Sequence, residues 1–167
     1  MRISLLSLVL ILGAGCAGTP PRPGNFERPA ISFPANGFIT QRAVVTIRGR
    51  QFPLNGYLAL SESGGKRLVI TESFGQVVAD VLVQPDGEVR VMRSSRMFPP
   101  KYIRLGVAVD LQCLFGGATK QDCPVEFLGV DHYLVKRRAY ALDLRILEVK
   151  PGPQPAALFE PGKVRRK

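Results

Sequence analysis

Histidine is almost absent from this chain, with His132 the single example among 167 residues. A catalytic triad or a histidine-based metal site would therefore have to be built on that one side chain. Neither the Gly-x-Ser-x-Gly motif of hydrolases nor a phosphate-binding loop is present. We expect His132 to lie at a strand end in a structural role, with its neighbour Asp131 pointing to the opposite face.

Acidic residues are also few, 13 against 23 lysines and arginines, and they are isolated in the sequence. No local pair of carboxylates is spaced for acid–base chemistry, and we expect these side chains to face solvent. Asp80 and Arg90 are expected to form a weak surface ion pair across a hairpin. The isolated acidic residues are Glu62, Glu72, Asp80, Glu88, Asp110 and Glu126.

One formal catalytic match exists, the Ser-x-x-Lys pattern of residues 63–66. That pattern works when serine and lysine lie one helical turn apart, and Gly64 and Gly65 between them disfavour a helix. We therefore predict a protein that is not an enzyme and that has neither a cofactor nor a metal site.

Long apolar runs are missing after residue 12, so no later segment is expected to cross a membrane. Arg2 precedes a short apolar run at residues 5–12, and the small residues 13–15 follow it. This order is typical of a secretory signal peptide, which we place at residues 1–15.

Cys16 follows the small residues directly, and this arrangement resembles the lipobox of bacterial lipoproteins. The resemblance implies a diacylglycerol on the Cys16 sulfur, cleavage before Cys16 and acylation of the new amino terminus. Ala17 stands where an aspartate would imply retention in the inner membrane, so an outer-membrane anchor facing the periplasm is expected. An ordinary secretory signal with an incidental cysteine is the alternative.

Two cysteines remain, Cys113 and Cys123, separated by a short glycine-containing loop. An oxidising compartment favours a disulfide between them, which would stabilise the fold by roughly 2–3 kcal/mol. A metal or redox pair is the competing interpretation, but the spacing is not Cys-x-x-Cys and only His132 could assist.

The formal net charge is +10, and basic residues cluster at residues 136–138 and 163–167. Such an excess attracts anionic lipid headgroups, acidic polymers or nucleic acid. Because an exported lipoprotein does not meet nucleic acid, lipid or an envelope polymer is the expected partner. A merely solvated surface that keeps the protein soluble is the alternative.

Prolines and alternating apolar residues divide the chain into a tether at residues 16–37, a domain at residues 38–150 and a loose basic tail at residues 151–167. Residues 43–92 read as strands, with a turn at Asn55-Gly56 and a loop at residues 61–67. The hairpin loop Pro85-Asp86-Gly87 would place Val83 opposite Val89 and Val81 opposite Val91.

Residues 101–115 alternate as a strand would, but the proline at their start and their length favour a helix. Strands are expected again at residues 125–128, 133–135 and 140–147, with a basic turn at residues 136–138. Pro151, Pro153 and Pro155 would end the last strand.

This order of elements, together with the lipobox, resembles the half-open barrels of the periplasmic carriers LolA and LolB. The stretch Val109-Asp110-Leu111-Gln112, followed by Leu114-Phe115, also looks like a helical segment of related uncharacterised lipoproteins. The resemblance implies an α+β fold, in which a curved antiparallel sheet and one main helix enclose an apolar cavity for acyl chains.

The expected function is therefore to bind or carry a lipid or lipoprotein acyl chain. The alternative is a scaffold lipoprotein that holds an envelope partner through its basic surface. A fully packed core without a cavity is equally compatible with the sequence. The candidate lipid-binding residues are Leu58, Leu60, Val69, Val81, Val83 and Val91, with Arg48, Arg50, Arg137 and Arg138 at the rim.

Overall fold

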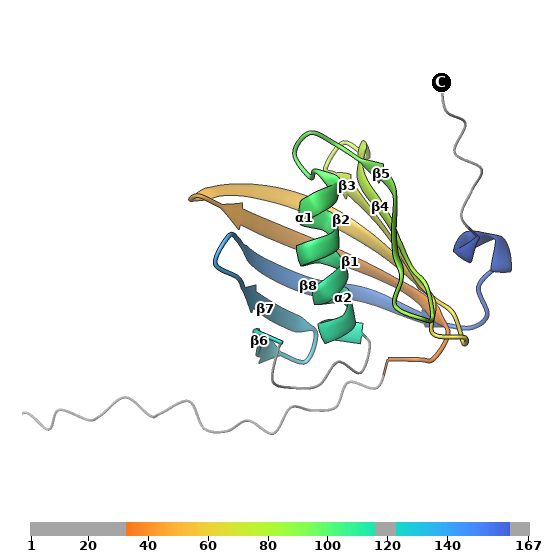
Figure 1. Ribbon diagram of the computed structural model, residues 1–167. Coiled ribbons are helices and arrows are strands. Elements are labelled where there is room, and N and C mark those ends of the chain that lie inside the picture. Colours follow the sequence, from red (N-terminus) through yellow and green to blue (C-terminus); the bar gives the residue numbers. More distant parts are fainter. Residues whose placement is uncertain (1–32, 116–122, 161–167) are drawn as a thin grey trace, which may run out of the picture.

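A computed structural model gives the fold of the chain and describes residues 33–115 and 123–160 (Figure 1). The signal peptide, Cys16 and most of the tether lie outside these described residues. So do the loop at residues 116–122 between the two cysteines and the basic cluster at residues 163–167.

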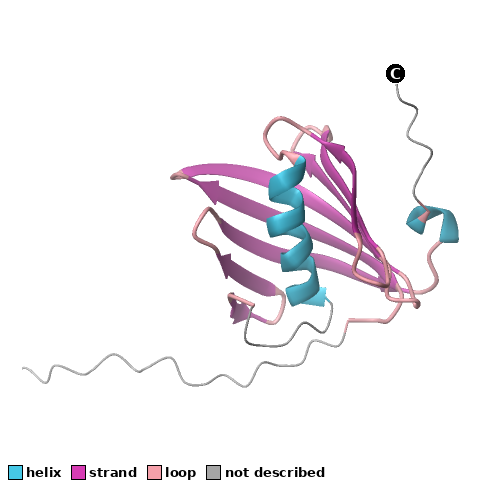
Figure 2. Cartoon of the chain, in the orientation of Figure 1, coloured by secondary structure: helices cyan, strands magenta, loops and turns pink. Residues whose placement is uncertain are grey.

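Eight antiparallel strands form one curved sheet in the order β5-β4-β3-β2-β1-β8-β7-β6. The strands are β1 (Gly37–Ile47), β2 (Arg50–Leu60), β3 (Lys66–Glu72), β4 (Val77–Val83), β5 (Val89–Ser94), β6 (Val125–Gly129), β7 (His132–Lys136) and β8 (Ala141–Pro151). The sheet does not close, because β5 and β6 are its two edges, and a helix crosses its concave face (Figure 2). The expected α+β fold with an open, curved antiparallel sheet and one main helix is confirmed.

The helix runs without a break from α1 (Pro100–Tyr102) through a π-helical turn, η1 (Ile103–Val107), to α2 (Ala108–Phe115). Pro100 suits the first turn, where its missing N–H has no helical partner to lose. The amide of Ala108 donates to the carbonyl of Ile103, so the wider π turn brings these two residues onto the buried face. The prediction of a helix for residues 101–115 is therefore confirmed.

The concave face of the sheet and the helix share one hydrophobic core. One row of this core crosses β1 to β4 and consists of four buried neighbours, Ile39, Leu58, Leu68 and Val81. From the helix, the core receives Phe98, just before it, and Ile103, Ala108 and Leu111 within it. Fully burying one such aliphatic side chain contributes about 1.5–3 kcal/mol, so this contact stabilises the fold.

The hairpin at Pro85-Asp86-Gly87 forms as predicted, with Val83 opposite Val89 and Val81 opposite Val91. Gly87 has a φ of 87°, which glycine adopts without a steric penalty. Turn chemistry and the apolar alternation agreed at this hairpin, and together they fixed its register.

The turn expected at Asn55-Gly56 was wrong, because both residues lie inside β2. The chain turns instead at Arg48-Gly49, where both residues have positive φ, 49° and 77°, as a tight two-residue hairpin requires. Gly56 serves another purpose. A Cβ there would lie 2.5 Å from Nε2 of Gln41, a buried side chain on the neighbouring strand, so only glycine leaves room for it.

The expected ion pair between Asp80 and Arg90 was also wrong. Asp80 of β4 pairs instead with Arg67, which lies diagonally opposite on β3. The guanidinium of Arg67 donates to both carboxylate oxygens of Asp80, at 3.0 and 2.8 Å. Arg90 instead pairs with Glu88 on the exposed surface. The loop expected at residues 61–67 is shorter, because β3 already begins at Lys66.

Part of the tail expected to be loose packs on the outer, convex face of the sheet. Residues 156–159 form a short 3-10 helix, η3 (Ala156–Phe159), and the Leu158 carbonyl accepts a hydrogen bond from Arg67 Nη1 at 3.0 Å. Arg67 stands between Ala59 and Leu82 in the ladder, and both of these outward-facing apolar residues are buried. The C-terminal segment therefore covers this part of the outer face.

We predict that Gly56→Ala lowers the free energy of unfolding by about 1–3 kcal/mol, because the new methyl group overlaps Gln41 in a packed core. Gln41→Ala should remove most of that loss in the double variant. Urea denaturation measures all three variants. Gly129→Ala is the control, since its Cβ would meet only ordinary contact at 3.7 Å. An undiminished loss in the Gln41→Ala background would contradict the overlap.

Candidate functional site

Most of the predicted lipid-binding side chains belong to the packed core. Leu58, Leu60, Val81 and Val83 point into the concave face and are almost fully buried under the helix. Val91 lies beside Val81 on the edge strand and is half-buried. The helix would therefore have to move before a ligand could reach these side chains.

Val69 does not belong to this set. It stands opposite Tyr57 and Asp80, on the convex face of the sheet. The strand β3 alternates, so Leu68 and Ile70 take the buried positions and Val69 faces outward. The expectation that Val69 lines a cavity with Val81 was wrong.

Two shallow hollows lie at one end of the sheet. This open end is formed by residues 52–54 of β2, the β3–β4 turn and Met97, just before the helix. One hollow, of about 250 Å³, is mainly apolar. Its lining residues are Phe52, Pro53, Leu54, Glu72, Ser73, Phe74 and Met97.

Phe74 is the most unusual residue of the open end, because its side chain is 97% exposed. It stands in the turn between β3 and β4, where Gly75 has a φ of 81° and donates its N–H to the Glu72 carbonyl. Met97, across the hollow, is 38% exposed. Apolar side chains grouped at the mouth of a hollow mark a surface that meets an apolar partner.

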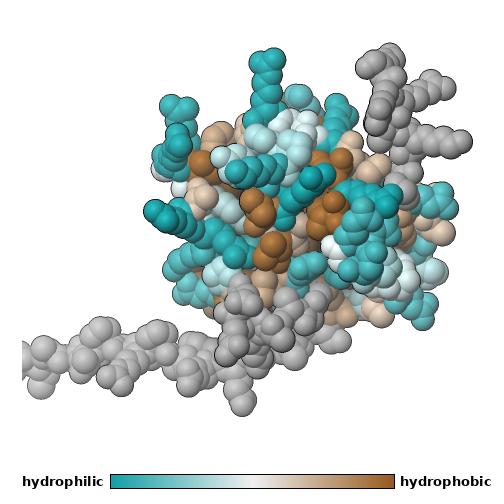
Figure 3. Space-filling model, in the orientation of Figure 1, coloured by the Kyte–Doolittle hydropathy of each residue, from teal (hydrophilic) through white to brown (hydrophobic). Residues whose placement is uncertain are grey.

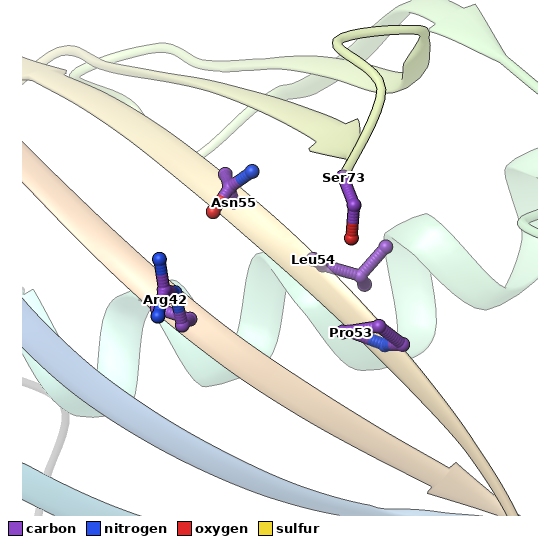
Figure 4. A pocket seen from close by; sticks show the side chains of 5 residues that line it. All are labelled: Arg42, Pro53, Leu54, Asn55 and Ser73. Atoms are coloured by element: carbon purple, nitrogen blue, oxygen red, sulfur yellow. The ribbon is translucent and has the colours of Figure 1, made fainter.

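The second hollow, of about 290 Å³, adjoins the first and shares Pro53, Leu54 and Ser73 with it. Arg42 and Asn55 complete its lining, and Figure 4 shows their side chains projecting from neighbouring strands on the side away from the helix. Arg42 forms no ion pair with any other described residue. The two hollows therefore meet at residues 53 and 54 of β2 but open on opposite faces of the sheet, the apolar hollow on the inner face and Arg42 on the outer face.

A buried polar cluster holds the helix on the sheet. Asp110 of α2 is 3% exposed, and its Oδ1 accepts from Arg137 Nε and Nη2 at 3.0 and 2.8 Å. The Tyr140 hydroxyl donates a short hydrogen bond to the other carboxylate oxygen. Burial raises the pKa of Asp110, and the hydrogen bonds from Tyr140 and Arg137 act in the opposite direction. The expectation that Asp110 faces solvent was wrong.

The same cluster explains a glycine in the middle of the helix. A Cβ on Gly106 would lie 3.0 Å from the Tyr140 hydroxyl oxygen, so glycine lets the tyrosine ring approach the helix. Burial raises the pKa of Tyr140 well above its usual range, so the hydroxyl remains a donor at neutral pH.

The predicted cysteine pair lies at the far end of the helix from the two hollows. Cys113 and Cys123 form a disulfide with their Cα atoms 5.4 Å apart, which ties the end of α2 to the start of β6. Phe33 packs against Phe115 at the same end, with ring centroids 4.7 Å apart. The disulfide, the aromatic pair and the Asp110 cluster thus all hold the second half of the helix in place.

The predicted rim arginines are not equivalent. Arg137 is committed to Asp110, so its guanidinium is not free for a headgroup. Arg138 is exposed beside it in the β7–β8 turn. Arg48 and Arg50 are exposed at the β1–β2 turn and therefore lie at the opposite end of their strands from Leu60.

His132 and the Ser-x-x-Lys pattern of residues 63–66 lie in different parts of the described fold. His132 opens β7, and its Nε2 lies 2.8 Å from Oδ1 of Asp143, not of its neighbour Asp131. Ser63 lies in the turn before β3, and the ammonium group of Lys66 donates to the Gly64 carbonyl at 3.2 Å. No group of three histidine, cysteine or acidic side chains is placed to hold a metal within residues 33–115 and 123–160.

No described helix is long and apolar enough to span a bilayer. Neither a scan against protein-family models nor a search of curated proteins finds a match for this chain.

Sequence reasoning missed the open end because its residues come from three separated segments. Phe74 could have been noticed, since a large aromatic residue between a serine and a glycine is unusual in a turn. Phe52 and Met97 gave no such signal, because only the curvature of the sheet brings them together.

We predict that Arg137→Gln lowers the free energy of unfolding by about 3 kcal/mol, because it leaves the buried Asp110 carboxylate without its charged partner. Arg138→Gln removes the same charge from the next, exposed position and should change stability by less than about 0.5 kcal/mol. Chemical denaturation of both variants is the measurement. If both variants lost the same free energy of unfolding, the ion pair between Asp110 and Arg137 would not be what stabilises the buried carboxylate.

Proposed function

We propose that this protein is a membrane-anchored envelope lipoprotein that binds an acyl chain of a lipid or lipoprotein at the open end of its sheet. The observation that carries the proposal is the apolar hollow at this end of the sheet. It is lined mainly by apolar side chains, among them the exposed Phe74. An acyl chain could lie against this lining.

The anchor is Cys16, with the outer membrane facing the periplasm as the proposed location. The disulfide between Cys113 and Cys123 supports an oxidising compartment outside the cytoplasm. Cleavage before Cys16 and acylation there would keep the domain at a membrane, where acyl chains are available.

The size of the hollows sets a limit on the ligand. At about 250 and 290 Å³ they are smaller than most sites for small molecules, which hold roughly 300–1,000 Å³. Each therefore suits the end of an acyl chain better than a whole phospholipid. The buried residues under the helix belong to one hydrophobic core.

The curved, open sheet with a helix on its concave face also supports the proposed likeness to the LolA and LolB carriers. In those carriers the concave side holds the acyl chain, whereas here the helix fills it with Ile103, Ala108 and Leu111. Acyl binding at the open end would therefore be a variation on that architecture.

The filled concave face favours a second candidate function, a non-catalytic scaffold that holds an envelope partner. Such a protein needs no cavity, and exposed basic residues such as Arg48, Arg50 and Arg138 would supply the contact. Both functions leave the protein without a catalytic role, a cofactor or a nucleic-acid partner.

The test of acyl binding uses the full chain with Cys16→Ser, so that no acyl group can be attached, and a dansyl-labelled fatty acid as the probe. We predict that Met97→Asp raises the dissociation constant at least tenfold, because it puts a charge in the apolar lining. Leu128→Asp, on the edge strand β6, is the control of similar exposure, 48% against 38%, and should bind as the parent does.

A parent protein that does not raise the fluorescence of the probe would overturn the acyl-binding proposal. Equal weakening by Met97→Asp and Leu128→Asp would place the binding elsewhere. If the probe does not bind, chemical crosslinking in cells through the exposed arginine surface becomes the test of the scaffold function.

A further inference from the structure

The chain segment that leads into the helix is strongly basic. Residues 89–109 contain five lysines and arginines and no acidic residue. Arg90 pairs with Glu88, but the other four form no ion pair within the described part of the chain. These four, all exposed, are Arg93, Arg96, Lys101 and Arg104.

Large apolar side chains are exposed between these basic residues. Tyr102 and Leu105, one helical turn apart, are 62% and 66% exposed on the outward face of the helix. Lys101 and Arg104 flank them on the same face. A helix of this size normally turns polar side chains to solvent, so the two apolar residues indicate contact with something other than water.

The helix start and the open end belong to one surface. In Figure 1 the turn between β3 and β4, the segment after β5 and the first turn of the helix all lie at the same end of the molecule. Met97 joins the two parts, because it lines the apolar hollow together with Phe74 and precedes the helix by three residues. Figure 3 shows apolar surface interrupted by hydrophilic side chains on this side of the molecule.

We infer that this surface docks on an anionic phospholipid bilayer. The docking surface consists of Phe74, Arg96, Met97, Lys101, Tyr102, Arg104 and Leu105. The inference deepens the proposed function, because the hollow that would take an acyl chain opens on the same surface.

A bilayer fits this combination of side chains better than an acidic protein does. Lysine and arginine reach anionic headgroups with their charged ends, while their aliphatic stems lie along apolar surface. Tyrosine suits the boundary between headgroups and acyl chains, and Phe74 and Leu105 can enter the acyl region. Glu72 is the one carboxylate among the residues that line the mouth of the hollows, so little opposes a negatively charged surface.

The position of the anchor is compatible with this docking. The described chain begins beside Phe115, at the end of the helix opposite the docking surface. Residues 16–32 can span at most about 60 Å when extended, whereas the helix from Pro100 to Phe115 is about 24 Å long. The tether is therefore long enough for the docking surface to meet the membrane that carries the anchor.

The test measures flotation of the full chain with vesicles, with Cys16→Ser in every sample so that differences come from the domain. The vesicles contain phosphatidylcholine with about one third phosphatidylglycerol, or phosphatidylcholine alone. We expect Lys101→Gln/Arg104→Gln to weaken binding to the anionic vesicles about 25-fold, at roughly fivefold for each charge. Arg145→Gln/Lys150→Gln, which removes two exposed charges from β8, should change it less than threefold.

The apolar part of the docking surface is tested separately. Phe74→Ser and Leu105→Ser should each weaken binding about tenfold, and both side chains are exposed enough for the variants to fold. Val130→Ser, which changes an exposed apolar residue of the β6–β7 turn, should have no effect. Circular dichroism of each variant checks that the sheet is intact.

Equal losses for Lys101→Gln/Arg104→Gln and for the β8 control would overturn the inference, since binding would then follow net charge alone. Equal binding to neutral and anionic vesicles would overturn it as well. A parent chain that binds neither kind of vesicle would also overturn it and would turn attention to an acidic protein partner. Binding of the dansyl fatty acid is measured without vesicles, so the failure of one proposal is distinguishable from the failure of the other.

Discussion

The contact between one helix and the concave face of the sheet determines the rest of this structure. Ile103, Ala108 and Leu111 fill the space that the curvature of the sheet creates, and no other described layer covers that face. The Asp110 carboxylate would be costly to bury alone, but Arg137 and Tyr140 satisfy it and fix the helix to the β7–β8 turn. The position of the open end follows from where this helix begins.

At the open end the sheet extends beyond the helix. Phe52 and Leu54 continue the inner face of β2, yet the chain enters the helix only after Met97. Apolar surface that is buried elsewhere on this face is therefore left at the mouth of a hollow, with Phe74 beside it. Both proposed functions, acyl binding and membrane docking, use this part of the inner face that the helix does not cover.

The sequence was sufficient where local chemistry and apolar pattern agreed, as at the hairpin that pairs Val81 with Val91. The predictions from sequence were wrong where a residue is explained by a contact with a residue far away in the chain. Asn55-Gly56 resembles a turn, but Gly56 is a glycine because Gln41 of the neighbouring strand occupies its space. Asp110 gave no local signal, since its partners lie 27 and 30 residues further along the chain. The open end depends on the curvature of the sheet, which periodicity does not show.

The strand order has a consequence for the way this protein reaches its folded state. Strands β1 to β5 follow one another as neighbours, so they can pair as the chain emerges from its amino-terminal end. The free side of β1, however, is covered only by β8, and Arg137 and Cys123 also come late in the chain. During synthesis from the amino terminus, the chain therefore exposes one edge of β1, and its helix lacks Arg137 and Cys123, until the C-terminal strands have been made.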